Sequence, residues 1–158
     1  MAIRDVIKVP NPMLAQKSEE VKIIDKSIKK LVKDMFETMK KNNGIGLAAV
    51  QIGVLKRIIV IEIEQEDIKT ELINPKILSY SSSKSTMEEG CLSVPKSYYN
   101  VERPTEIVVE FTNLKNEVQK IEASGLFARC IQHEIDHLNG ITIVDKGNLA
   151  ASSESNHG

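Results

Sequence analysis

Apolar side chains recur at helical spacing between residues 26 and 41, which predicts an amphipathic helix over that range. Asp25 or Ser27 can cap its first turn, and Gly44 lies just past its last turn. We expect the apolar stripe of this helix to pack into the protein core. The stripe consists of Ile28, Leu31, Val32, Met35, Phe36 and Met39.

Short segments with strand propensity follow this helix. β-branched residues favour strands over 57–63 and, for part of its length, over 71–79. Two further strands are predicted at 105–112 and 117–122, and the residues between them are typical of a hairpin turn. Residues 81–85 are polar and predict a loop.

A second helix is predicted over residues 125–138, where Ser124 can cap the start and Gly140 ends the pattern. Residues 141–145 favour one more short strand, and residues 1–24 an irregular arm. The fold class that follows is α+β: short antiparallel strands packed around a central helix, with one further N-terminal helix.

The length of 158 residues fits one domain with a real hydrophobic core. We assign residues 1–146 to this single catalytic domain. Residues 147–158 are rich in Ser, Ala, Asn and Gly, and we expect them to form a disordered tail.

Composition and charge exclude several classes of partner. Hydrophobic residues make up 41% and charged residues 27%, as in ordinary soluble globular proteins. The formal net charge of −1 gives no reason to expect a specific nucleic acid partner, and the lysines of the first helix are interpreted as a solvated face. A secretory signal and an apolar run of about 20 residues are both missing, so we expect a cytoplasmic protein without a membrane partner.

The second helix carries an H-E-x-x-H pattern, His133-Glu134-Ile135-Asp136-His137. Its two histidines lie one turn apart on one face, so both imidazoles can reach one metal ion. Glu134 stands where a carboxylate can take a proton from metal-bound water. The pattern therefore predicts a catalytic metal site. The alternative, a pair of hydrogen-bonded core histidines, leaves Glu134 as a third polar group to satisfy in the same place.

A zinc-type site needs a third protein ligand. The metzincin pattern would place a histidine where this chain has Ile143, and the one glutamate after His137 is Glu154 in the polar tail. Cys130 lies about 10 Å of helix rise from His137, at about 1.5 Å per residue, which is poorly placed for a shared metal. A thiolate from upstream is a strong ligand, so we choose Cys91 and expect Cys130 to line the pocket.

The segment 44–51, G-I-G-L-A-A-V-Q, matches a dinucleotide fingerprint by letter. That motif requires a strand before it and a helix after it, whereas a lysine-rich helix precedes it here, so nucleotide binding is rejected. A helix stop followed by a turn explains Gly44 but leaves Gln51 without a role.

Three segments together resemble the peptide deformylase family. They are G-I-G-L-A-A-V-Q at 44–51, E-G-C-L-S at 89–93 and Q-H-E-I-D-H at 132–137, in the order and with the spacing of that family. V-P-N-P-M-L at 9–14 is similar to the family's start, and the resemblance covers nearly all of residues 5–146.

The resemblance implies a bacterial-type enzyme that removes the formyl group from the N-terminal formylmethionine of newly made proteins. The metal ligands that it implies are Cys91, His133 and His137, with water in the open fourth position. Glu134 would take the proton of that water and later pass it to the departing amine. The Gln51 amide and the backbone N–H of Leu92 would stabilise the oxyanion that forms.

The resemblance also implies how the substrate binds. The methionine side-chain pocket would be lined by Ile45, Leu126, Arg129, Cys130 and His133. Arg129 is expected to contribute its aliphatic stem and to leave its head in water. An extended substrate would pair its backbone near Ile45, Gly46 and Glu89. An ion pair between Arg103 and Asp136 has two interpretations that stay open, one that orients the site and one that is purely structural.

Ferrous iron is the metal that the resemblance implies, although Zn²⁺ or Ni²⁺ also suits a Cys-His-His site. The expected partners are N-formylmethionyl nascent peptides, with a transient ribosome contact. Many bacterial members continue into a C-terminal helix, but residues 147–158 predict none.

Two other functions compete with this interpretation. A metalloprotease that cleaves internal peptide bonds is disfavoured by the absent third histidine of the metzincin pattern. A non-catalytic domain with a structural metal is disfavoured because such sites usually have four protein ligands, and three good ones are found here.

Overall fold

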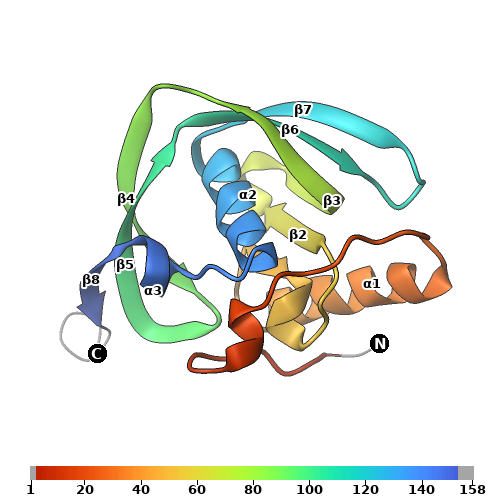
Figure 1. Cartoon of the computed structure of the whole chain (residues 1–158), viewed down its shortest axis with the longest axis horizontal. Helices are drawn as coiled ribbons and strands as arrows, with labels where there is room; N and C mark the ends of the chain where they lie inside the picture. Colours follow the sequence, from red (N-terminus) through yellow and green to blue (C-terminus); the bar gives the residue numbers. More distant parts are fainter. Residues whose placement is uncertain (1–2, 153–158) are drawn as a thin grey trace.

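The computed structural model describes residues 3–152 and combines two antiparallel sheets with helices (Figure 1). This is the α+β class expected from the sequence. The larger sheet has the order β1-β2-β3-β6-β7 and the smaller one the order β4-β5-β8. The strands span Gly46–Ala48 (β1), Ile58–Ile63 (β2), Ile68–Tyr80 (β3), Lys84–Cys91 (β4), Val94–Pro104 (β5), Glu106–Thr112 (β6), Val118–Ser124 (β7) and Asn148–Ser152 (β8).

The two longer helices agree with the sequence prediction. Helices α1 and α2 span Lys26–Lys41 and Gly125–Leu138, and the short α3 spans Ile143–Lys146. Helix α1 begins where the carboxylate of Asp25 accepts a hydrogen bond from the backbone N–H of Ile28, which satisfies one of the unpaired donors of its first turn. Three 3₁₀ turns, Pro12–Ala15 (η1), Ala49–Ile52 (η2) and Glu64–Glu66 (η3), complete the elements.

Helix α2 lies at the centre of the molecule and packs against strands of both sheets (Figure 1). Ten of its 14 residues are buried, because apolar side chains cover two neighbouring stripes of the helix. Because the surrounding residues hold its side chains in fixed positions, this helix can orient the side chains of a functional site.

Strand β2 separates the two main parts of the core. Ile59 and Ile61 pack in the cluster that contains α2, whereas Ile58 and Val60 pack in the cluster that contains α1. Since successive strand residues point to opposite faces, a continuous apolar run can serve both clusters. The larger sheet is therefore covered by α2 on one face and by α1 on the other.

Two predictions of local structure are wrong, and a third is correct only in part. Residues 141–145 do not form a strand: they lead into α3, where the backbone N–H of Thr142 donates to the carboxylate of Asp145 at 3.0 Å. The expected disordered tail begins instead with β8, because the edge of β5 offers backbone groups with which residues 148–152 can pair. Residues 153–158 of that tail lie outside the described residues. The loop predicted at 81–85 gives way to β4 at Lys84.

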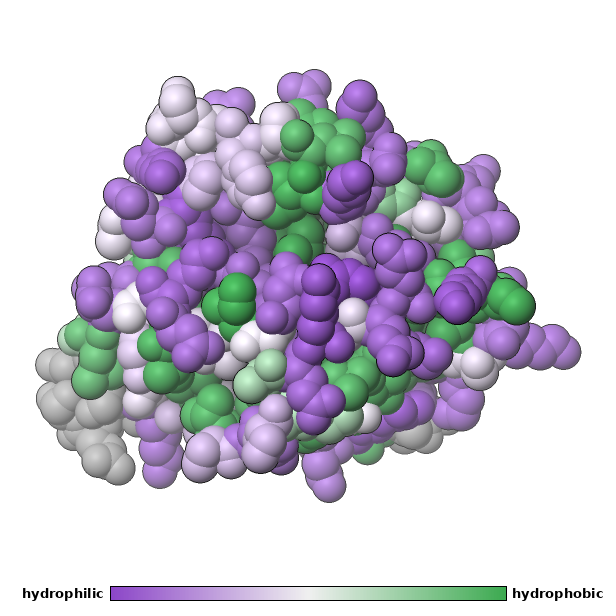
Figure 2. All heavy atoms as spheres, in the orientation of Figure 1, coloured by the Kyte–Doolittle hydropathy of each residue, from purple (hydrophilic) through white to green (hydrophobic). Residues whose placement is uncertain are grey.

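The molecular surface shows no continuous apolar belt on the face drawn in Figure 2, where green apolar patches alternate with purple polar side chains. Within residues 3–152, no helix is both long enough and apolar enough to span a bilayer.

Candidate metal centre

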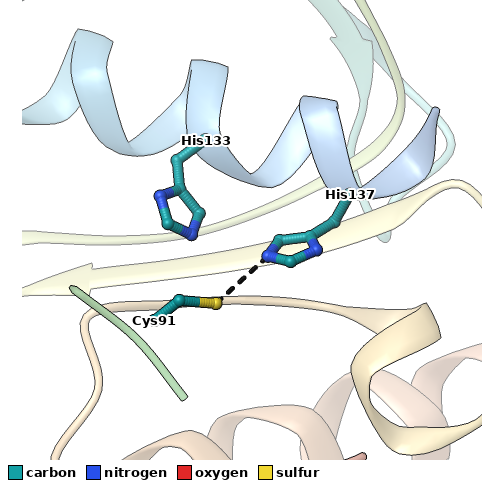
Figure 3. A group of neighbouring side chains, drawn as sticks. All are labelled: Cys91, His133 and His137. Carbon is teal, nitrogen blue, oxygen red and sulfur yellow. Dashed lines mark hydrogen bonds between the residues drawn. The ribbon is translucent and has the colours of Figure 1, made fainter. Parts of the chain in front are cut away.

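Helix α2 and the end of β4 bring together the three side chains expected to bind a metal (Figure 3). The ligand atoms of Cys91, His133 and His137 all lie within 4.8 Å of one another. The Sγ atom of Cys91 is 3.2 Å from Nε2 of His137. Among the described residues, Cys130 is not part of this group. One small volume thus contains a thiol and two imidazoles from segments that are more than 40 residues apart in the sequence.

The turn between β4 and β5 places Cys91 opposite α2. Cys91 pairs with Val94 at the closed end of this hairpin, so residues 92 and 93 form its tip. The side chain of Val94 is buried, in a small cluster that Cys91 also contacts. The hairpin is therefore anchored on the core side, which fixes the thiol.

The donor set fits a metal ion with an open position. A thiolate and two imidazoles suit iron, zinc or nickel better than magnesium or calcium. Atom Oε1 of Glu134 is buried and has no hydrogen-bond partner in the described part of the chain, as expected of a carboxylate that acts on a further ligand. Three protein donors also match catalytic rather than structural sites.

Burial controls the protonation of the polar groups on α2. It raises the pKa of the Glu134 carboxyl to about 7, near the value at which a carboxylate can both accept and return a proton. Burial, together with the positive charges of His133 and Arg103, lowers the pKa of His137 to about 3. His137 is therefore neutral at physiological pH, the form in which an imidazole binds a metal.

Gln51 reaches the centre from η2. Its side-chain oxygen accepts a hydrogen bond from the backbone N–H of Ala48, which orients the amide. Its nitrogen then donates to Ser93 at 3.1 Å and to the Cys91 sulfur at 3.6 Å. The Gln51 N–H group consequently faces the space beside the thiol.

A groove of about 420 Å³ opens beside these residues. Its lining contains every residue for which a substrate contact was expected: Ile45, Gly46, Glu89, Leu126, Arg129, Cys130 and His133. Ile45 and Leu126 are 40% exposed, so apolar surface is available at the groove. Met87, Lys96 and Tyr98 also line it, and no pattern in the sequence predicted them.

Gly46 allows β1 to approach the reactive part of α2. A Cβ atom at this position would lie 2.7 Å from Glu134 Oε2 and 2.7 Å from Cys130 Sγ. Real Cβ atoms do not come this close to other heavy atoms. Any larger residue at this position would therefore displace Glu134 or the strand. The Cys130 sulfur lies 3.9 Å from the carbonyl oxygen of Ile45, so this thiol sits between β1 and α2, outside the ligand group.

The expectation that the head of Arg129 would lie in water is wrong. Its guanidinium is buried and donates to the carboxylate of Glu89. Glu89 in turn accepts a hydrogen bond from Nδ1 of His133 at 2.9 Å. Sequence reasoning placed Glu89 near the substrate through its backbone and missed this buried carboxylate, although its position two residues before Cys91 was a usable signal.

The Arg103–Asp136 ion pair expected from the sequence is present, with a distance of 2.8 Å between Nη1 and Oδ2. Arg103 also forms two hydrogen bonds with Glu89. The pair therefore connects to the side chain that holds His133, which favours the interpretation that it orients the site.

The family model, the related sequences and the solved structures to which this chain is similar all belong to one family. A family model described as "Polypeptide deformylase" matches residues 3–153. A peptide deformylase of Finegoldia magna is 50% identical over 146 residues, which cover 92% of this chain and 90% of that protein. Among solved structures, peptide deformylase from Ehrlichia chaffeensis in complex with actinonin has a TM-score of 0.90 at 44% identity and covers 92% of this chain and 89% of that one. The Thermotoga maritima enzyme has a TM-score of 0.90 at 34% identity, over 94% of this chain and 99% of that one.

Proposed function

The chain belongs to the polypeptide deformylase family, and on that premise we propose that Cys91, His133 and His137 bind its catalytic metal ion. The protein is a metal-dependent hydrolase that removes the N-terminal formyl group of newly synthesised proteins. The observation that carries the ligand assignment is the clustering of a thiol and two imidazoles beside a buried carboxylate.

We propose Fe²⁺ as the ion in the cell, with Zn²⁺ or Ni²⁺ able to replace it. The Cys-His-His donor set is compatible with all three. When bound, the ion supplies Lewis acidity, which polarises the formyl carbonyl and makes a water molecule nucleophilic at neutral pH.

Glu134 acts as the proton carrier of this reaction. Its Oε1 atom, which has no hydrogen-bond partner within residues 3–152, can accept the proton of the attacking water, and the same carboxyl can deliver that proton to the departing amine. The raised pKa supports both steps, because the group can exchange a proton near neutral pH.

Gln51 and Leu92 stabilise the charge that develops on the formyl oxygen. The Gln51 N–H group faces the space beside Cys91, and Leu92 is the next residue along the chain. Donors that are already oriented cost no reorganisation during the reaction, so a side-chain amide and a backbone N–H are effective in this role.

The groove receives the substrate in an extended conformation. The formylmethionine side chain packs against Ile45, Leu126, Cys130 and the stem of Arg129, while its backbone pairs near Gly46 and Glu89. Strands β1 and β4 each lie at the edge of their sheet, so both offer backbone groups for such pairing.

Residues 1–146 supply all of these groups, and we assign the catalytic domain to them. We propose that the enzyme acts in the cytoplasm on nascent chains and makes a transient contact with the ribosome.

Release of free amine from a formyl-Met-Ala-Ser peptide tests the function. The protein is purified without oxygen and supplied with ferrous iron; an acetylated peptide and a chelator serve as controls. We expect release from the formyl peptide alone, and the chelator should stop it. No release by folded, metal-loaded protein would contradict the proposal, and casein digestion by the same sample would favour a metalloprotease instead.

A further inference from the structure

The guanidinium of Arg129 connects α2 to both long strands of the smaller sheet. Besides Glu89, its Nη1 atom donates to the backbone carbonyl of Val101 at 3.0 Å. Its Nη2 atom donates to Ser85, to the carbonyl at 2.8 Å and to the hydroxyl at 3.1 Å. With 6% of the residue exposed, this is a buried cation whose Nη1 and Nη2 atoms both donate to protein groups on β4 and β5.

The carboxylate of Glu89 is held on both of its oxygens. Oε2 accepts from Arg129 and, at 2.7 Å, from Nε of Arg103. Oε1 accepts from Nη2 of Arg103 at 3.0 Å and from Nδ1 of His133 at 2.9 Å. Two guanidinium groups therefore fix the rotation of the carboxylate, and the remaining acceptor position of Oε1 is directed at the histidine.

We propose that Arg129 is a positioning residue for the metal centre, which acts on His133 through Glu89. This inference rests on the ligand assignment made above. By holding Oε2 and the backbone of β4, Arg129 keeps Oε1 against Nδ1 of His133. The imidazole then turns its other nitrogen toward Cys91 and His137, as the ring orientations in Figure 3 show.

The chemistry of the arginine side chain is specific to this task. Its planar fork presents donors in two directions at once, toward the carboxylate and toward Ser85. A lysine at this position carries the charge, but its three N–H donors share one nitrogen atom and cannot span Glu89 and Ser85 as the planar guanidinium does. The stem of Arg129 meanwhile lines the groove.

The test compares Arg129→Met and Arg129→Lys with Arg57→Met. Methionine keeps an apolar stem in the groove, and Arg103 still neutralises Glu89. Arg57 is the matched control, because it also holds α2 through buried carbonyls: it donates to Leu138 at 3.1 Å and to Ser18 at 3.3 Å, and it does not contact Glu89.

Metal affinity is measured by competition with a chelator, and the visible spectrum of the cobalt-loaded protein reports the ligand geometry. We expect Arg129→Met to weaken metal binding by about 10- to 100-fold and to shift the cobalt bands. Arg129→Lys should lose less affinity. Arg57→Met should unfold at a lower urea concentration yet bind metal with the affinity and spectrum of the unmodified protein.

The outcomes separate this inference from the assignment on which it rests. If Arg129→Met retains full affinity and an unchanged spectrum, Arg129 has a structural role only and the inference is overturned. If the unmodified protein shows no thiolate-to-cobalt band, or keeps that band in Cys91→Ser, the ligand assignment itself fails and the positioning role fails with it.

Discussion

Glu134 is the residue on which the proposed chemistry depends most directly. His133 and Ile135 on either side of it are buried, and glutamine has nearly the shape of glutamate, so a change confined to the charge leaves the packing intact. Glu134→Gln should keep the metal and lower turnover by about 100- to 10,000-fold, because the amide cannot carry the proton. Turnover and metal content are measured on the same sample. Unchanged turnover with full metal content would remove Glu134 from the mechanism.

The two cysteines provide a matched pair of variants. Cys91→Ser should weaken metal binding, since an alcohol is a poor substitute for a thiolate. Cys130→Ser should retain the metal, because its sulfur lies outside the ligand group. Chelator competition on both proteins decides the assignment, and the reverse result would exchange the roles of the two thiols.

The proposed metal ligands could be predicted from residue types in the sequence, whereas the contacts of the side chains around them could not. His133 and His137 follow from helical spacing alone, and Cys91 from the shortage of other donors. The buried position of the Arg129 head could not be predicted, because it depends on β4 passing beside α2. Only a tertiary contact between segments about 40 residues apart reveals that Glu89 and Arg129 are partners.

At the scale of elements, α1 is attached to the N-terminal arm by a buried carboxylate. Asp34 is 1% exposed and pairs with Arg4 at 2.8 Å and with Lys30 at 3.1 Å. Burial alone would raise the pKa of Asp34, but the hydrogen bonds and charges of these two partners outweigh it and hold the pKa below its ordinary value. The ion pairs therefore stabilise the folded state wherever Asp34 is ionised.

Asp34→Asn should lower the free energy of unfolding at pH 7 by about 1–3 kcal/mol. A depressed pKa gives stability that is fully present above the unfolded value of 3.8 and is lost as the pH falls through the folded value. The difference from the unmodified protein should thus be constant from pH 7 to 5 and shrink below pH 4. Urea unfolding across this range measures it.

Asp25→Asn is the control for this variant, because it removes a charge from the same helix while asparagine can still cap it. Its stability should change little at any pH. An Asp34→Asn deficit that persists undiminished at pH 3 would contradict the electrostatic explanation.

The two long helices and the strands β2, β3, β6 and β7 were predictable from local patterns, whereas β4, β5 and β8 were not, for a physical reason. The boundaries of α1 and α2 are encoded locally, by apolar spacing and by flanking Asp25, Gly44 and Gly140. Strands β4 and β5 contain prolines, a glycine and many polar residues, and they form through pairing with each other. Strand β8 likewise forms because it pairs with the edge of β5. No local sequence pattern predicts this pairing.

For the whole molecule, metal binding and stability should be linked. The three proposed ligands come from β4 and α2, which the unfolded chain does not hold together, so the ion should bind the folded state preferentially. Adding Zn²⁺ to chelator-stripped protein should raise the melting temperature by several degrees. At 100 times the dissociation constant, the linkage amounts to about 2.7 kcal/mol.

Calorimetry at a series of zinc concentrations measures this shift, and Mg²⁺ serves as the control because it avoids thiolate and imidazole donors. The Mg²⁺ samples should melt like the stripped protein. Equal melting temperatures with zinc and with magnesium would speak against an intact metal centre.

The buried position of α2 has a consequence for how this protein can change over generations. Ten of its 14 residues are buried, and His133, Glu134 and His137 of the proposed centre are among them. A substitution that alters packing there also moves a ligand or the carboxylate, so stability and catalysis cannot drift independently within this helix. We therefore expect amino-acid substitutions to accumulate at the rim of the groove and on the outer faces of the sheets, and not within α2.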